Sequence, residues 1–278
     1  MKTSAWARFP HSNTTYEYPA DALADAWEHL HRGDREPFPD AERIHALDPD
    51  CTDPNQVAER LQQAWRDYHA GRLAAAVEAA LELGPIAHAV ANKASGIYAD
   101  YLEEEDAARL AIYQAGIQRA EQAIAAFPED PNAHYFHAFL LGRYSQCISV
   151  AKALAQGVGG KIRQSLDRAL ELEPGHAEAH TALGVYHAEI IDKVGKMVGR
   201  MTYGASADKA EEECRRALEL TPEAPIAHLE YGNALYLLYG DRRLDESNKA
   251  YATAAKLKPA DAMQKLDVEY ARSYAAGD

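Results

Sequence analysis

The chain has 278 residues, and 47% of them are hydrophobic, which is typical of a folded protein. Its 29 Lys and Arg against 43 Asp and Glu give a formal net charge of −14, which argues against general affinity for nucleic acid or for anionic membranes. With three dispersed cysteines, no apolar signal segment at the N-terminus and no long apolar run, we expect a cytoplasmic protein with reduced thiols and no membrane span.

Residues 1–53 differ from the rest of the chain in being rich in prolines and aromatic residues. Apolar residues recur there at helical spacing only within Asp21–His31, which predicts one short helix that ends near Gly33. The aromatic side chains of this N-terminal arm predict that it docks on the remaining fold. We therefore expect two parts, the arm at 1–53 and a helical array at 54–278.

From residue 54 onward the apolar pattern is helical almost without interruption, and no stretch alternates with a period of two. Pro54 is suited to begin the first helix, and Gly71 marks the turn into the second. Later helices are expected at roughly 86–102, 105–127, 131–156, 160–172, 176–194, 206–220, 224–239, 243–257 and 260–274. The charged residues of the last helix suit a polar cap that ends a helical array.

One pattern recurs along the array: a helix ends, a proline turn follows, and a new helix begins at once. The clearest copy runs from Ala169 through Pro174-Gly175 to His187, and variants surround Pro128, Pro222 and Pro259. Because one helical hairpin cannot bury its apolar face alone, the repeat predicts an all-α solenoid. We expect about five antiparallel helix pairs and a C-terminal capping helix.

This unit resembles the tetratricopeptide repeat (TPR), a helix pair of about 34 residues with small residues at fixed positions. In the unit that begins at Ala177, His180 stands where the family often has tryptophan. Leu183-Gly184 match the family's Leu-Gly pair, and Pro222 matches its terminal proline. The resemblance implies a helical scaffold or binding protein without catalysis.

The middle repeats are longer than usual, with 46 residues from Pro128 to Pro174 and 48 from Pro174 to Pro222. In this respect residues 130–270 resemble the regulator of microtubule dynamics family. A second resemblance is to the T-component of certain solute transporters, a periplasmic repeat protein, but the missing export signal counts against it.

An Ala-His pair recurs at 87–88, 133–134, 179–180 and 227–228. We expect these histidines to pack between helices with backbone partners, since a ladder of metal ligands lacks the necessary further ligands. No Ser-His-Asp or Cys-His arrangement follows from the spacing. Catalytic residues, a metal and a cofactor are therefore not expected.

In TPR proteins the first helix of each pair lines the inner, concave face. Counted from the matched histidines, that face is expected to present Asn132, Tyr135, Phe139, Arg143, Thr181, Val185, Glu189, Asn233 and Tyr236. Aromatic side chains with a few hydrogen-bonding groups suit a peptide or a small amphipathic ligand. Contacts of some of these residues with the arm or with neighbouring helices are an equal alternative.

Cations gather in the turns within the pairs, whereas carboxylates gather in the turns between pairs. The expected basic edge consists of Lys161, Arg163, Lys193, Lys196 and Arg200. Stacking of the repeats would place the basic turns on one edge of the solenoid and the acidic turns on another. The alternative is that these charges are only solvated, because turns at a protein surface are commonly polar.

We therefore expect a non-catalytic scaffold or adaptor that binds a peptide segment on its concave face. The alternative is a small-molecule or lipid-binding protein with a pocket between the long middle helices. The expected partner is an unidentified protein or peptide, with neither nucleic acid nor membrane. The partner's identity, the oligomeric state and whether the arm fills the groove stay open.

Overall fold

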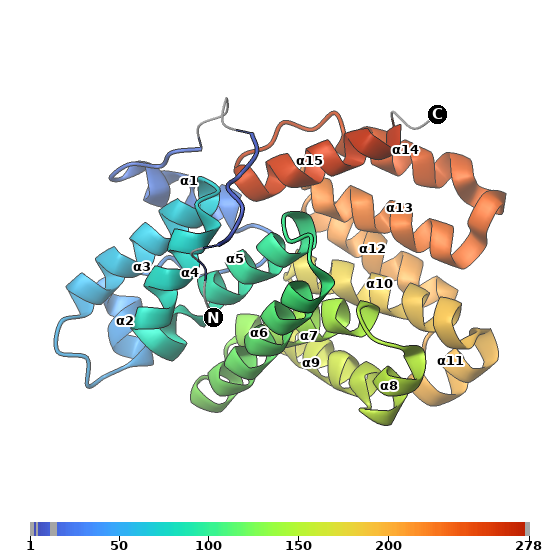
Figure 1. The fold of residues 1–278 in the computed structure, drawn as a ribbon, viewed down its shortest axis with the longest axis horizontal. Helices are drawn as coiled ribbons and strands as arrows, with labels where there is room; N and C mark the ends of the chain where they lie inside the picture. The colour runs from blue at the N-terminus through green and yellow to red at the C-terminus, as the bar shows by residue number, and fades with distance from the viewer. Residues whose placement is uncertain (1–2, 4, 12–15, 276–278) are drawn as a thin grey trace. The chain divides into compact units, whose positions relative to one another are not determined.

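The computed structural model describes the chain except residues 1–2, 4, 12–15 and 276–278 (Figure 1). Within the described ranges all regular structure is helical and no strand occurs, as the sequence predicts. The contacts divide the chain into two compact units. The first comprises Met1–His31, Arg35–Cys147 and Asp261–Met263, and the second comprises Arg32–Asp34, Ile148–Ala260 and Gln264–Asp278.

The first unit is a stack of helices in which, from α2 to α7, each packs on the next along the chain. Its helices are α1 Ala22–Leu30, α2 Ala41–Leu47, α3 Pro54–His69, α4 Leu73–Leu83, the 3-10 helix η1 Gly84–Ala87, α5 His88–Tyr101, α6 Asp106–Ala126 and α7 Pro131–Gln146. Helix α3 pairs with α4 and α5 pairs with α6, while α7 packs on both α5 and α6. This is the helix-pair stacking that the repeat pattern predicts.

The N-terminal arm lies against α3, α4 and α5. The Trp6 ring stacks on Tyr98 at a centroid distance of 3.9 Å, and the Trp27 indole meets the edge of Trp65 at 5.7 Å. The sequence predicts one short helix in this arm, and the structure has two. The second, α2, buries only Ile44 and is too short to display an apolar stripe.

The stretch Leu73–Tyr101 is long and apolar enough to cross a membrane by length and composition, which corrects the expectation that no such stretch exists. The expectation considered uninterrupted apolar runs, whereas here alanines raise the mean hydropathy around scattered polar residues. The structure bends this stretch at Gly84, where φ is 71°, and packs α4 against α5. Because α5 is buried throughout His88–Ala99, its apolar composition is that of a core helix. Its buried Asn92 accepts a hydrogen bond from Arg119 at 2.8 Å.

The second unit continues the same architecture with two short helices inserted. Its helices are α8 Val150–Ala155, α9 Val158–Leu172, α10 Ala177–Val194, α11 Lys196–Tyr203, α12 Ala207–Leu220, α13 Pro225–Tyr239, the 3-10 helix η2 Gly240–Arg243, α14 Leu244–Ala254 and α15 Ala262–Ala275, of which the first two residues belong to the first unit. Helix α10 packs on α9, α12 and α13, and α13 packs on α14. With these pairs and the final α15, the predicted TPR-like solenoid is confirmed.

The inserted helices differ from the prediction. The sequence predicts one helix over 131–156, but α7 ends at Gln146 and α8 begins at Val150. The break occurs because Ser149 caps α8, with its hydroxyl accepting a hydrogen bond from the Lys152 backbone N–H at 3.2 Å. Helix α11 falls in a glycine-flanked segment for which no helix is predicted, and its eight residues are enough for only about two turns.

Candidate functional site

Three of the repeated histidines close the turn that precedes their helix. In each, the ring Nε2 binds the carbonyl oxygen of a proline six residues earlier. The pairs are His134 with Pro128 at 2.8 Å, His180 with Pro174 at 3.1 Å and His228 with Pro222 at 2.8 Å. Because a carbonyl oxygen only accepts, the Nε2–H group donates in every copy. We call this arrangement the histidine staple.

The histidine staple corrects the expectation that these residues pack inside the core, since all three rings are half-buried. A backbone partner is present, as expected. The fourth histidine, His88, is buried, stacks on Phe127 and faces Asp130 at 3.5 Å. Burial opposes ionisation of Asp130, but the hydrogen bond and charge of His88, together with Arg43, hold the pKa of this carboxyl below its usual value. In the described residues, no group of three or more His, Cys, Asp or Glu could hold a metal ion.

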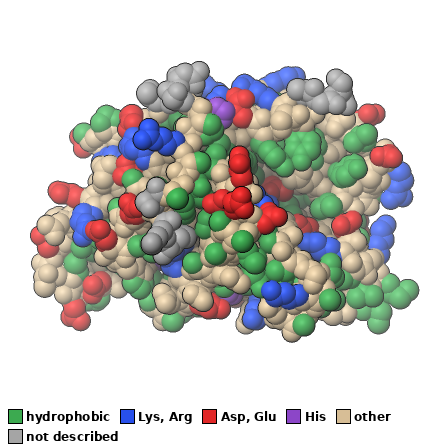
Figure 2. All heavy atoms as spheres, viewed as in Figure 1, with side chains coloured by type: hydrophobic (Ala, Val, Ile, Leu, Met, Phe, Trp, Pro, Cys, Tyr) green, Lys and Arg blue, Asp and Glu red, His purple; other side chains and the backbone are tan. Residues whose placement is uncertain are grey.

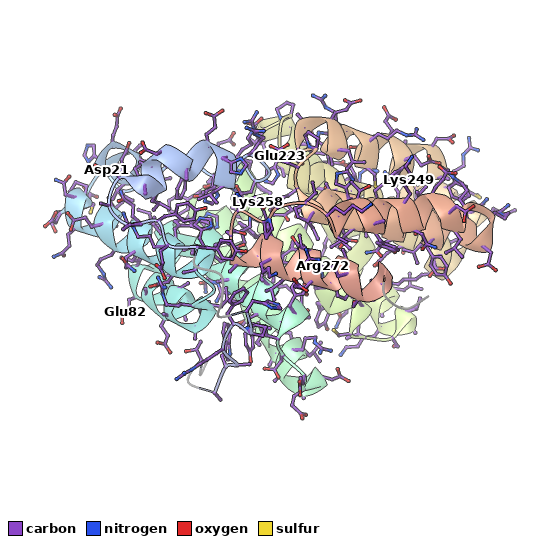
Figure 3. The ribbon with its side chains drawn as sticks, turned by 90° about the horizontal axis from the view of Figure 1, so that it is seen from above. Asp21, Glu82, Glu223, Lys249, Lys258 and Arg272 are labelled. Carbon is purple, nitrogen blue, oxygen red and sulfur yellow. The ribbon has the colours of Figure 1, made fainter. Side chains whose placement is uncertain are left out.

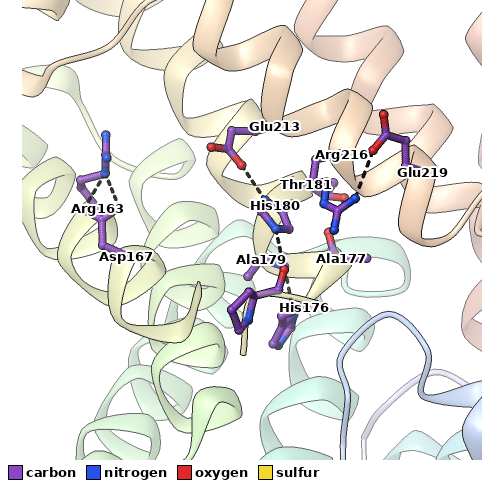
Figure 4. Close-up of polar contacts among 11 residues, drawn as sticks. Arg163, Asp167, His176, Ala177, Ala179, His180, Thr181, Glu213, Arg216 and Glu219 are labelled. Atoms are coloured by element: carbon purple, nitrogen blue, oxygen red, sulfur yellow. Dashed lines mark hydrogen bonds and ion pairs between the residues drawn. The ribbon is translucent and has the colours of Figure 1, made fainter. Parts of the chain in front are cut away.

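The clearest copy of the staple lies at the start of α10 (Figure 4). Besides Pro174, the His180 ring faces Glu213 of α12, with Nδ1 and Oε2 separated by 2.6 Å. His176 caps the same helix, because its Nδ1 accepts a hydrogen bond from the Ala179 backbone N–H at 3.1 Å. The sequence places His176 in the turn but gives no sign of its capping role, since histidine is not a usual cap residue.

The predicted inner-face residues of α7 are engaged by other parts of the first unit. Asn132 is fully buried and donates a hydrogen bond to Glu36 of the arm at 2.7 Å. Tyr135 is buried and stacks on Phe139 at 6.2 Å. The alternative of contacts with the arm therefore describes Asn132, whereas the stacking of Tyr135 on Phe139 lies within α7.

Arg143 belongs to the same group. Its guanidinium lies over the Phe139 ring at 5.6 Å, and its Nε is 3.0 Å from Asp100 Oδ2. Asp100 also accepts a hydrogen bond from the Tyr113 hydroxyl at 2.5 Å. Burial, followed by the nearby Asp100 charge, raises the pKa of Tyr113, so this phenol stays a donor. The cluster ties α5, α6 and α7 together.

The predicted inner-face residues of α10 are mostly satisfied within their own helix. The Thr181 hydroxyl is buried and donates to the Ala177 carbonyl at 3.0 Å. Glu189 pairs with Lys193 one turn later, at 2.8 Å, while Val185 is half-buried. A binding role for these three residues stays a prediction.

The predicted pair on α13 lies in a partly exposed group of one asparagine and four tyrosines, which we call the tyrosine surface: Asn233, Tyr236, Tyr251, Tyr270 and Tyr274. The Tyr251 hydroxyl donates to Asn233 Oδ1 at 2.6 Å, and the Tyr251 ring stacks on Tyr274 at 5.0 Å. Burial, above all, raises the pKa of Tyr251, and nearby Tyr274, Glu230 and Tyr236 add to the effect. The side chains of Tyr236, Tyr270 and Tyr274 are 52%, 43% and 48% exposed.

The last two of these tyrosines are not among the predicted site residues. Both lie on α15, which the sequence presents as a charged cap, and no repeat spacing connects them with α13. Their i, i+4 spacing on one helix is the only available signal.

The five residues of the predicted basic edge divide into two groups. Arg163 pairs with Asp167 at 2.6 Å and Lys193 with Glu189. Lys161, Lys196 and Arg200 are exposed and form no ion pair with any residue that the structure describes. The unpaired cations belong to α11 and to the first turns of α9. Their role at an edge stays a prediction.

Comparison with known proteins finds one matching family and a solved structure of similar fold. Residues 86–223, from η1 to the turn after α12, match the model of the family described as Regulator of microtubule dynamics protein 1-3. A crystal structure of TTC0263, a thermophilic TPR protein from Thermus thermophilus, has a similar fold, with a TM-score of 0.56. The chain is a TPR-like protein whose middle part resembles the regulator of microtubule dynamics (RMD) family.

The solved TPR protein shares 16% identity with this TPR-like protein, over 78% of this chain and 99% of that chain, so the likeness shows the fold alone. No curated protein matches the sequence. The RMD-like match begins well before residue 130, where the sequence resemblance starts. Its first helix pair, α5 and α6, does follow an Ala-Leu-Glu-Leu sequence at residues 80–83, but Pro85 lies only three residues before His88, whereas proline and histidine lie six residues apart in the later copies.

Proposed function

We propose that this TPR-like protein is a non-catalytic scaffold that binds an extended segment of another protein. The tyrosine surface carries the proposal, because it combines two predicted inner-face residues, Asn233 and Tyr236, with exposed aromatic rings on α15. Tyrosine is enriched at protein interfaces, where its ring contributes apolar contact area and its hydroxyl a hydrogen bond.

The order of the tyrosine surface supports recognition of a partner without rearrangement. Tyr251 is held by Asn233 and by the stacked Tyr274 ring, and Tyr270 meets Tyr274 edge-on at 5.1 Å with their hydroxyl oxygens 3.0 Å apart. Side chains that are already ordered lose little conformational entropy when a partner binds.

A photo-reactive residue tests the proposal directly. Replacing Tyr236 by p-benzoylphenylalanine should give discrete covalent adducts with one or a few proteins after irradiation in the native lysate. Adding Tyr270→Ala and Tyr274→Ala to the same chain should reduce these adducts. The matched control carries the photo-reactive residue at Leu244, an exposed hydrophobic position on α14. Identical adducts from both positions, or adducts that ignore the tyrosine substitutions, would show that the tyrosine surface does not select a partner.

A further inference from the structure

The two inserted helices of the second unit expose apolar side chains. On α11, the side chains of Met197 and Met201 are 76% and 81% exposed, and Val198 is 48% exposed. On α8, Val150 and Leu154 are 43% and 49% exposed. Figure 2 shows hydrophobic side chains gathered over α11, at the lower right of that view. Scattered apolar residues are normal on a surface, but three large exposed apolar side chains on one helix of eight residues indicate a contact with something else.

One side of α11 is fixed to the unit. Gly199 is buried so closely that a Cβ there would lie 3.3 Å from Ile190, and Tyr203 lies beside Gly159 at the start of α9. Because α8 ends just before α9 begins, both inserted helices border the start of α9. Met197 and Met201, at i and i+4, form one stripe on the outward side of α11.

The charge around these helices is opposite to that of the whole chain. Neither α8 nor α11 contains an Asp or Glu, and none occurs anywhere in residues 193–207. Lys196 and Arg200 form a cationic stripe one helical position from the methionine stripe, and neither pairs with a described carboxylate. The cations are therefore free to meet an anionic surface.

We propose that α11, together with α8, is a docking surface for an anionic phospholipid bilayer. Short helices with cations next to exposed apolar residues lie in the bilayer interface, where the apolar side chains enter the acyl boundary and the cations meet the headgroups. The net charge of −14 suggests the opposite, but at physiological ionic strength charges more than about 8 Å away are largely screened. The nearby cations Lys196 and Arg200 then determine the electrostatic interaction of α11 with the bilayer.

The exposure of the methionines favours a bilayer over an acidic peptide. A peptide-binding groove surrounds its apolar residues with walls, as in helix-in-groove recognition. Met197 and Met201 instead stand out, with about three quarters or more of each side chain in solvent. Side chains that protrude in this way can insert into the acyl region of a lipid bilayer, whereas they make little contact with a rigid peptide.

Sedimentation of the full chain with vesicles tests the proposal. The chain should bind vesicles of phosphatidylcholine with phosphatidylserine, bind vesicles of phosphatidylcholine alone at least about tenfold more weakly, and lose binding as salt rises. The variants Lys196→Glu with Arg200→Glu, and Met197→Ser with Met201→Ser, should each weaken binding at least about tenfold. All the substituted side chains are exposed, so an unchanged circular dichroism spectrum and thermal midpoint are expected.

The matched control is Lys249→Glu with Lys258→Glu, the same charge change at two exposed lysines elsewhere in the second unit (Figure 3). This variant should bind the anionic vesicles within about twofold of the original chain. The proposal is overturned if the original chain binds neither kind of vesicle, if the control loses as much binding as the α11 charge variant, or if the methionine variant binds fully. Loss of a soluble acidic partner from both α11 variants, without vesicle binding by the original chain, would also overturn it and assign the surface to a protein.

Discussion

A single imidazole closes each of three turns between helices in this chain. The histidine occupies a position where TPR proteins often carry tryptophan, and its ring uses a hydrogen bond to the backbone in addition to packing. Each proline lies in the turn two residues after a helix ends, where its carbonyl oxygen has no helical partner, so the Nε2–H group satisfies an acceptor that would otherwise depend on water. The histidine staple therefore acts on the turn and not on a ligand.

Replacing His228 by alanine should lower the free energy of unfolding by about 0.5–1.5 kcal/mol, because one hydrogen bond to Pro222 is lost at a half-buried site. Urea unfolding followed by circular dichroism measures the change. The control is His45→Ala, at an exposed histidine of α2, which should change stability by less than about 0.5 kcal/mol. Equal effects at the two sites would contradict a stapling role.

His187 gives stability a dependence on pH. Burial, reinforced by the cations Arg163 and Lys209, lowers its pKa to about 4 from the ordinary 6.5. The unfolded chain therefore binds this proton more readily than the folded chain between these values. Stability falls as pH drops from about 6.5 to 4, and the loss levels off below about 4.

The variant His187→Gln removes this titration and should flatten the dependence. Between pH 6.5 and 4 the original chain should lose about 3 kcal/mol more stability than the variant. Urea titrations of both proteins at several pH values measure the difference, and titrations shared by the two proteins cancel. Parallel curves would show that His187 does not titrate differently in the folded chain.

At the scale of the helices, the close approach of α10 and α12 determines which residue fits at their crossing. A Cβ added at Gly184 of α10 would meet Cys214 Sγ and lie 3.0 Å from the Ala210 backbone oxygen of α12. Backbone atoms cannot move aside as a side chain can. The Leu-Gly pair that signals the repeat in the sequence is therefore required by the crossing of α10 and α12.

Gly184→Ala should destabilise the chain by about 1–3 kcal/mol through this overpacking. The matched control, Gly142→Ala, places the same methyl group on α7, where nothing lies within 4 Å of the new Cβ. It should be neutral or stabilising by up to about 1 kcal/mol, since alanine favours helix over glycine. Thermal unfolding of both variants measures the contrast, and a destabilisation shared by both would indicate a backbone effect in place of a steric one.

The long helices are predictable from the sequence because their apolar periodicity is strong over several turns. Helices α2, α8 and α11 are not, because six to eight residues contain too little of the period, and in each a cap or glycine sets the ends. The candidate site is predicted less completely. The repeat register finds Asn233 and Tyr236. It cannot show that the Asn132 side chain is hydrogen-bonded to Glu36, or that Tyr270 belongs to the tyrosine surface. Those facts depend on contacts between residues that are distant in sequence.

At the scale of the whole molecule, all three tryptophans, Trp6, Trp27 and Trp65, lie in the first unit. Trp27 is 6% exposed and packs against Trp65, Phe38 and the stacked His31 ring. Tryptophan fluorescence therefore reports on the first unit alone, while circular dichroism reports on all helices.

Trp27→Ala should destabilise the first unit by about 3–5 kcal/mol, because a large buried ring leaves a cavity between the arm and α3. The fluorescence transition of the remaining tryptophans should move to lower urea concentration. Tyr236→Ala, an exposed aromatic of the second unit, is the control and should leave that transition in place. An unchanged midpoint in Trp27→Ala would mean that the arm contributes little to the stability of the first unit.

The histidine staple also explains how this chain tolerates repeats of different length. Proline and histidine lie six residues apart in all three copies, although the three prolines are separated by 46 and then by 48 residues. Each joint is thus complete in itself and independent of the length of the helices beyond it. Extra residues collect at the opposite end of a helix pair, where α8 and α11 are found. Segments that run from one of these prolines to the next should therefore be exchangeable between positions in the chain. New surface helices could be inserted in the turn within a helix pair without changing the proline–histidine turn between pairs.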